Sequence, residues 1–153
     1  MSKSKTVVFV CTGNTCRSPM AAAIATSIFK EHELDITVLS VGVAADDGFP
    51  ASENAIGAMH EENIDLKPHR STQISEEILS GASLILTMTA GHLRIVKTLH
   101  PKSNAFTLGE YANNSNDVSD PYGGSLEIYR QCAAQIKQLL TASVAKIKEA
   151  LAL

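Results

Sequence analysis

The sequence predicts an α/β fold, a single-domain open sheet of four parallel strands with helices on both faces. Two observations lead to this prediction. Apolar, β-branched runs alternate along the chain with segments of helical period, which is the pattern of βαβ units around a buried parallel sheet. The 153 residues contain no repeat, no low-complexity tract and no linker rich in proline or glycine, so residues 1–153 are expected to form one domain.

Each expected strand is a short apolar run, and each expected helix repeats its apolar residues with a period of about 3.6. Pro19 suits the first turn of a helix, where its missing N–H costs no hydrogen bond, and Ser125 is a suitable N-cap. In chain order, we expect the strand Thr6–Val10, the helix Pro19–His32, the strand Ile36–Ser40, the helix Ala51–Asn63, a short helix near Ser75–Ser80, the strand Ser83–Met88, the helix Ala90–Leu99, the strand Asn104–Leu108 and the helix Ser125–Ala152.

Composition limits the classes of partner. The net charge is −3 and neither sign forms a block, which argues against nucleic acid and against an anionic membrane surface. The apolar run Val7–Val10 is too short for a signal peptide or a membrane span, so a cytoplasmic protein is expected. The three cysteines are odd in number, and their spacing does not suggest a disulfide framework. Thiol chemistry is therefore the function to look for.

The segment from Cys11 to Ser18 connects an expected buried strand to an expected helix. A loop in this position can curl so that successive N–H groups point inward, and the following helix adds the positive end of its dipole. We therefore expect a phosphate-binding loop after the first strand. Its dipoles would favour Cys11 as a thiolate nucleophile, and Arg17 would return to the same side to hold two phosphate oxygens.

Other residues of this segment fit the same interpretation. Ser18 is suited to donate a hydrogen bond to the sulfur, Gly13 to permit a strained turn, and Asn14 to adopt a left-handed conformation or to tie the loop to its neighbours. Cys11 taken alone could be an ordinary small buried residue. A nucleotide-binding loop is disfavoured because the segment holds a single glycine, and a zinc site because Cys11 and Cys16 lack knuckle spacing and a second pair.

The run from Val7 to Ala21, VVFVCTGNTCRSPMA, resembles the signature of the low-molecular-weight protein tyrosine phosphatases, in which a cysteine is followed by five residues, an arginine and a serine or threonine. Those enzymes also carry an Asp-Pro-aromatic segment near the C-terminus, which Asp120-Pro121-Tyr122 matches. The resemblance implies a protein phosphatase that forms a cysteinyl-phosphate intermediate without a metal or cofactor and acts on phosphorylated proteins. It also implies that Asp120 protonates the leaving group and then activates the hydrolytic water.

The resemblance implies roles for further residues. Ser40 and His69 match residues that support the loop, and the histidine does so through the residue that matches Asn14. The chain departs from many relatives at Ala22, where they have glutamate, and this difference concerns the helix surface and not the chemistry. The substrate would be bound by Thr12, Gly13, Asn14, Thr15, Cys16, Ser18 and Tyr122.

Two positions bear on the substrate. Many tyrosine-directed members have an apolar residue where this chain has Thr15, and a second aromatic residue where this chain has Gly123. Thr15 together with Asp-Pro-aromatic-Gly-Gly resembles the bacterial protein arginine phosphatases, a branch of the family. A planar phosphoarginine guanidinium could stack on Tyr122 and donate hydrogen bonds to Asp120 and to the Thr15 hydroxyl. Phosphoarginine hydrolysis is therefore the expected activity, and phosphotyrosine hydrolysis is the alternative.

Two further classes of protein stay open. An arsenate reductase of the same fold would need further cysteines, but none lies between Arg17 and Cys132. An inactive phosphoprotein-binding module would give Asp120 no role as an acid. Oxidation is expected to link Cys11 and Cys16 reversibly, whereas Cys132 is expected to be a buried residue of the last helix. The chain is expected to be a monomer.

Overall fold

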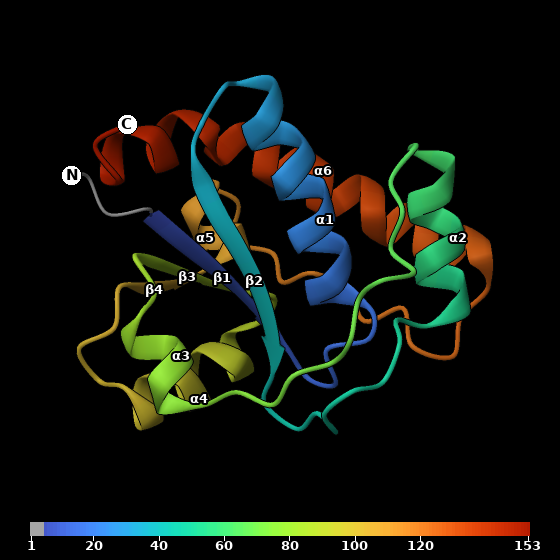
Figure 1. Cartoon of the computed structure of the whole chain (residues 1–153), viewed down its shortest axis with the longest axis horizontal. Coiled ribbons are helices and arrows are strands. Elements are labelled where there is room, and N and C mark those ends of the chain that lie inside the picture. Colours follow the sequence, from blue (N-terminus) through green and yellow to red (C-terminus); the bar gives the residue numbers. More distant parts are fainter. Residues whose placement is uncertain (1–4) are drawn as a thin grey trace.

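The computed structural model describes residues 5–153. Its strands form one parallel sheet in the order β2-β1-β3-β4 (Figure 1). The predicted fold class is confirmed, and every expected strand is present with ends that differ by at most two residues. The strands are β1 (Lys5–Cys11), β2 (Ile36–Gly42), β3 (Leu84–Thr87) and β4 (Ala105–Thr107).

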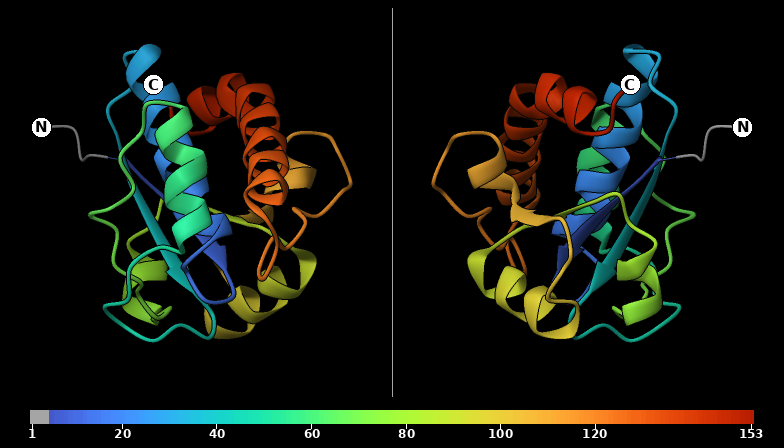
Figure 2. Two further views of the ribbon diagram at one scale, coloured as in Figure 1. Left: turned by 90° about the vertical axis from the view of Figure 1, so that its right-hand side faces the viewer. Right: turned by 90° about the vertical axis from the view of Figure 1, so that its left-hand side faces the viewer.

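Helices cover both faces of the sheet, as predicted. The two side views in Figure 2 place α1, α2 and α6 on one side of the strands and α3 and α4 on the other. No helix in the described part of the chain is long and apolar enough to cross a membrane. The helices are α1 (Arg17–Glu31), α2 (Glu53–Glu61), α3 (Glu76–Ser80), α4 (Ala90–Leu99), α5 (Leu108–Tyr111) and α6 (Leu126–Ala150).

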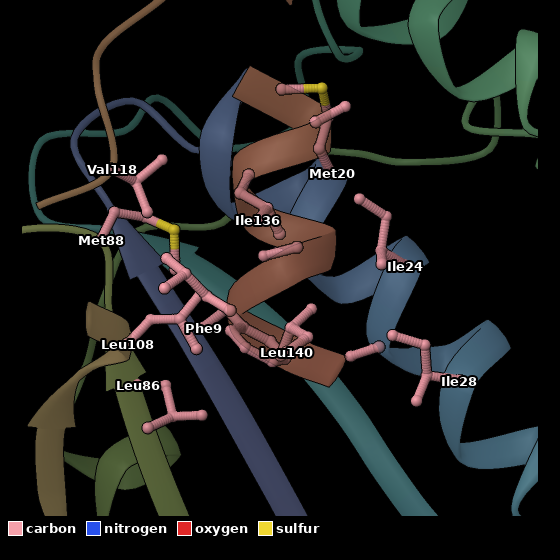
Figure 3. Close-up of a cluster of buried hydrophobic side chains, with 14 of the residues drawn as sticks. Phe9, Met20, Ile24, Ile28, Leu86, Met88, Leu108, Val118, Ile136 and Leu140 are labelled. Atoms are coloured by element: carbon pink, nitrogen blue, oxygen red, sulfur yellow. The ribbon is translucent and has the colours of Figure 1, made fainter. Parts of the chain in front are cut away.

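The central strand β1 is buried on both faces because its side chains alternate between two hydrophobic clusters. Phe9 and Cys11 face the cluster under α1 and α6, whereas Val8 and Val10 face the cluster under α3 and α4. In Figure 3, Phe9 lies among residues of β3 and α6. Complete burial of each such large apolar side chain contributes about 1.5–3 kcal/mol. This burial fixes the end of β1, and therefore Cys11, with respect to the rest of the fold.

The start of α1 differs from the start of the other helices. Five helices begin with a serine or threonine whose side chain accepts an N–H of the first turn, whereas Cys16 before α1 makes no such bond. The first N–H groups of α1 are therefore available to a ligand, together with the positive end of the helix dipole. The capping residues are Ser52, Ser75, Thr89, Thr107 and Ser125, and the predicted cap at Ser125 is confirmed.

Some predicted boundaries are wrong. The first helix begins at Arg17 and not at Pro19, so the proline is its third residue, where an N–H still has no helical partner. The second helix runs over Glu53–Glu61 only, since Ser52 caps its start. The short helix α5 was not predicted, because Leu108 follows an apolar strand without a change of composition.

Candidate active site

A pocket of about 250 Å³ opens beyond the C-terminal end of β1, at the edge of the sheet where parallel strands commonly present ligand sites. The residues around it come from residues 11–18, named here the cysteine loop, and from residues 117–122, named here the Asp120 loop. The pocket is lined by Cys11, Thr12, Gly13, Thr15, Cys16, Arg17, Asp120 and Tyr122, all of which belong to the predicted site. The other predicted residues, Asn14, Ser18, Ser40 and His69, contact the cysteine loop or one another through hydrogen bonds.

The backbone of the cysteine loop turns its carbonyl groups away from the pocket. The Cys11 and Thr12 carbonyl oxygens each accept an N–H of the segment after β2, at 2.9 Å in both cases. The Thr15 carbonyl oxygen accepts the Ser52 N–H, also at 2.9 Å. In a trans peptide the C=O and the following N–H point in opposite directions. The N–H groups that follow these carbonyls therefore point toward the pocket and can bind an anion.

Cys11 is buried beside the hydroxyl of Ser18. The Cys11 Sγ and Ser18 Oγ atoms are 2.8 Å apart. The Asn14 side-chain amide donates to the same Ser18 oxygen at 2.8 Å. The single Ser18 hydrogen can be donated either to the Cys11 sulfur or to the Val41 carbonyl oxygen, which is farther away at 3.4 Å. A hydroxyl that donates to sulfur stabilises a thiolate, both before attack on phosphorus and when the sulfur leaves.

Asn14 holds the loop in shape. Its φ is 57°, in the left-handed region, and its side chain also donates to Ser40 at 3.0 Å and accepts the Thr72 N–H at 2.9 Å. The His69 Nε2–H donates to the Asn14 carbonyl oxygen at 2.7 Å, and burial lowers the pKa of His69. The strained-turn role that the sequence suggested for Gly13 is wrong, since the loop residue with a positive φ is Asn14.

Arg17 is buried and its guanidinium bridges the two loops. Its Nη1 donates to the Val118 carbonyl oxygen at 3.1 Å, and its Nη2 lies 3.5 Å from the Thr12 hydroxyl. The same Nη2 lies 3.7 Å from a carboxylate oxygen of Asp120. Val118 lies beside the end of β3, where its N–H donates to the Met88 carbonyl oxygen (Figure 3). The bond from Arg17 to Val118 therefore connects the guanidinium to the sheet.

Asp120 stands at the rim of the pocket with its side chain 57% exposed. Its second carboxylate oxygen accepts the Tyr122 N–H at 3.1 Å, which stabilises the turn after Pro121. Tyr122 is 81% exposed and lines the pocket, so one face of its ring is available to a substrate. The left-handed Gly123, with a φ of 79°, ends this turn.

Cys16 lines the pocket, and its sulfur has two hydrogen-bond partners outside the cysteine loop. Its thiol donates to Ser52 Oγ at 3.5 Å, and the Tyr129 hydroxyl, 3.2 Å away, donates to its sulfur. Burial and the bond to Cys16 raise the pKa of Tyr129 to about 12.

Cys132 is buried in α6 as predicted, and burial raises the pKa of its thiol to about 12. Among residues 5–153, no group of three or more histidine, cysteine or acidic side chains is placed to bind a metal ion.

Sequence reasoning missed several residues that shape this site. They are Gly42 beneath the cysteine loop, Val118 and Tyr129, which contact Arg17 and Cys16, and His92, whose Nε2 lies 2.9 Å from the Thr12 hydroxyl. Of these residues, Gly42 alone could have been noticed from the sequence, because it is a glycine two residues after the predicted strand Ile36–Ser40. The other three contact loop residues at least 80 positions away in the sequence, as His92 contacts Thr12, so no local pattern reveals them.

Comparison with known proteins agrees with this geometry. A protein named protein-arginine-phosphatase from Bacillus subtilis is 40% identical over 146 residues, which cover 94% of this chain and 97% of that protein. A protein-tyrosine-phosphatase named PtpB from Staphylococcus epidermidis is 35% identical over 135 residues, 88% of this chain and 93% of that protein. Both relatives are named as protein phosphatases, in agreement with the predicted enzyme class.

Solved structures give the same result. The structure described as the YwlE arginine phosphatase, a cysteine-to-serine mutant with a phosphorylated active-site serine, superimposes with a TM-score of 0.88 at 39% identity. That match covers 94% of this chain and 95% of the other. The family model described as low molecular weight phosphotyrosine protein phosphatase matches residues 6–153. The chain therefore belongs to the low molecular weight phosphotyrosine protein phosphatase family.

Proposed function

We propose that this protein removes phosphate from phosphoarginine residues in proteins, with Cys11 as the nucleophile, Arg17 as the phosphate clamp and Asp120 as the general acid. The observation that carries the proposal is the position of Thr15, which lines the same pocket as Cys11 and Asp120. Two relatives, from Bacillus subtilis and Geobacillus stearothermophilus, are named protein-arginine-phosphatase, and these names support the choice of substrate.

In the first step, the Cys11 thiolate attacks phosphorus, the S–P bond forms and the N–P bond breaks. Asp120 gives its proton to the departing guanidine nitrogen, so the leaving group does not depart as an anion. In the second step, the Asp120 carboxylate takes a proton from water, which attacks phosphorus while the S–P bond breaks. The Cys11 sulfur leaves as a thiolate, to which Ser18 can donate its hydrogen bond.

The phosphoryl group is held by the cysteine loop throughout both steps. The inward N–H groups and the Arg17 guanidinium both surround the equatorial oxygens, where the negative charge is spread in the transition state. Arg17 is pre-positioned by its bond to the Val118 carbonyl oxygen, so little rotamer entropy is lost when the phosphoryl group binds.

The leaving group determines the specificity. A phosphoarginine guanidinium is planar and carries several N–H donors, which match the Thr15 hydroxyl, the carbonyl oxygen of the protonated Asp120 carboxyl group and the face of the Tyr122 ring. Phosphotyrosine hydrolysis is the second candidate, because the exposed Tyr122 ring can also contact a phenyl ring. The cytoplasmic location and the monomeric state stay predictions from the sequence.

Thr15→Ile tests the proposal. The branched alkyl group removes a polar partner of the guanidinium and offers apolar contact to a phenyl ring. A hydrogen bond to a charged group contributes about 1.5–3 kcal/mol, so the ratio of kcat/KM for a phosphoarginine peptide to that for a phosphotyrosine peptide should fall about tenfold or more. Thr26→Ile, the same change on an exposed position of α1, should leave the ratio unchanged.

The wild-type ratio decides between the two candidate substrates. A preference of the wild type for phosphotyrosine, or a ratio that does not move in Thr15→Ile, would assign the protein to the tyrosine-directed enzymes. Turnover of neither peptide by the wild type would contradict the proposal and leave the phosphoprotein-binding module and the arsenate reductase as candidates.

A further inference from the structure

His92 is a buried histidine of α4 whose ring contacts the cysteine loop. The residue is 5% exposed, and its Nε2 lies 2.9 Å from the Thr12 hydroxyl oxygen. Within residues 5–153, the Nδ1 of the same ring is buried without a hydrogen-bond partner. A buried polar atom without a partner costs stability, so a histidine here is explained by its contact with Thr12.

The charge and tautomer of His92 follow from its surroundings. Burial and the nearby positive charge of Arg17 lower the pKa of His92 to about 4, although Asp117 and Asp120 act in the opposite direction. The ring is therefore neutral near pH 7. A buried N–H without an acceptor is rarer than a buried acceptor without a donor. By the same reasoning we assign the hydrogen to Nε2, which then donates it to the Thr12 oxygen.

Thr12 connects this histidine to the phosphate clamp. Its hydroxyl oxygen can accept two hydrogen bonds, and the two donors around it are the His92 Nε2–H and the Arg17 Nη2–H, the latter at 3.5 Å. Thr12 itself is exposed, so without His92 its side chain could rotate toward solvent. The histidine restricts the hydroxyl to the rotamer in which it faces the guanidinium.

The first turn of α4 also holds the Asp120 loop. The Ala90 N–H donates to a carboxylate oxygen of Asp117 at 3.1 Å, and the Val118 N–H donates to the Met88 carbonyl oxygen at 2.9 Å, just before the helix. The Thr89 hydroxyl, which caps α4, accepts the His92 N–H at 3.2 Å. One short stretch of chain therefore positions both loops that contact Arg17.

We propose that His92 is a positioning residue, which fixes the Thr12 hydroxyl and through it orients the Arg17 guanidinium toward the bound phosphoryl group. The inference concerns the same site as the proposed phosphatase activity and rests on it. It predicts that His92 and Thr12 act as one unit, because the histidine ring is hydrogen-bonded to the threonine hydroxyl, which in turn contacts the guanidinium. Removal of either side chain should therefore slow the same catalytic step.

The experiment is a double-mutant cycle with His92→Leu and Thr12→Val, measured on p-nitrophenyl phosphate. Each single variant should lower kcat/KM about threefold to tenfold, the scale of one lost hydrogen bond, with most of the loss in kcat. The double variant should be no worse than either single one. His92→Gln, which can place an N–H near the Nε2 position, should recover part of the loss. Val96→Ala, a core truncation in the same helix, should lower Tm and leave kcat/KM unchanged.

The affinity for inorganic phosphate, measured by calorimetry, tests the coupling of His92 and Thr12 independently of catalysis. It should weaken in both single variants and weaken no further in the double variant. Additive losses in the cycle, or an unchanged kcat/KM in Thr12→Val, would overturn the proposal. A wild type that binds phosphate but hydrolyses nothing would refute the proposed function alone, and the phosphate affinities would then decide the role of His92. If His92→Leu does not fold, the cycle is closed with His92→Phe, which keeps a planar ring and removes both ring nitrogens.

Discussion

Gly42 lies directly beneath the cysteine loop, so close that a methyl group on its Cα would come within 2.5 Å of the Thr12 carbonyl oxygen. Gly42 is also the register partner of Cys11 between β2 and β1. The end of β2 therefore packs directly against the backbone of the cysteine loop, and only a residue without a side chain fits there.

Gly42→Ala is expected to impair both folding and activity. The methyl group must displace backbone atoms of the loop, for which overpacking costs of about 1–3 kcal/mol are typical. Tm should fall and phosphate affinity should weaken together. Gly81→Ala is the matched control, because a methyl group there would meet its nearest atoms at 3.7 Å. Equal behaviour of the two variants would show that the loop does not depend on this contact.

Cys11→Ser is expected to abolish turnover while the fold and phosphate binding persist. The substitution removes the nucleophile but leaves the inward N–H groups and Arg17 in place. Loss of an enzymatic nucleophile lowers kcat about 10³-fold or more. The measurement is aryl phosphate hydrolysis together with calorimetric binding of inorganic phosphate. Substantial turnover in this variant would rule out the covalent intermediate.

Asp120→Asn is expected to slow hydrolysis about 10²–10⁴-fold for substrates whose leaving group must be protonated. The loss should be much smaller in the first step for p-nitrophenyl phosphate, whose leaving group departs readily as an anion. Burst kinetics separate this step from hydrolysis of the intermediate. An equal effect on the first step for good and poor leaving groups would assign Asp120 a structural role, such as its 3.7 Å pair with Arg17.

Mild peroxide is expected to inactivate the protein reversibly. Peroxide converts the Cys11 thiolate to a sulfenic acid, which condenses with the Cys16 thiol to form a disulfide and water. Mass spectrometry should detect the linked pair, and a reductant should restore activity. In Cys16→Ser, oxidation should proceed to irreversible acids, whereas Cys132→Ser should behave as the wild type. Detection of sulfinic or sulfonic acid alone in the wild type would contradict the prediction.

Acidification is expected to destabilise the protein partly through His92 and His69. Both have pKa values lowered by burial, to about 4 for His92 from an ordinary value of 6.5. Below pH 6.5 the unfolded chain binds protons that the folded chain does not, so stability is lost as the pH falls from about 6.5 toward 4. Urea unfolding of His92→Gln should show a shallower loss over this range than the wild type. Parallel curves would mean that His92 does not contribute.

The order of strands and helices was predictable from the sequence because local periodicity reports burial, and the pattern of Cys11, Arg17 and Asp120 was recognisable by its spacing. The family comparison confirms that resemblance. What the tertiary structure alone decided is how these groups are oriented. The contacts of Arg17 with Val118, and of Thr12 with His92, join segments about 80 to 100 residues apart, and only the packing of α4 and the Asp120 loop against the ends of β1 and β3 brings them together. Hydrogen bonds of that kind leave no local pattern in a sequence, since any donor at the correct place in space can make them.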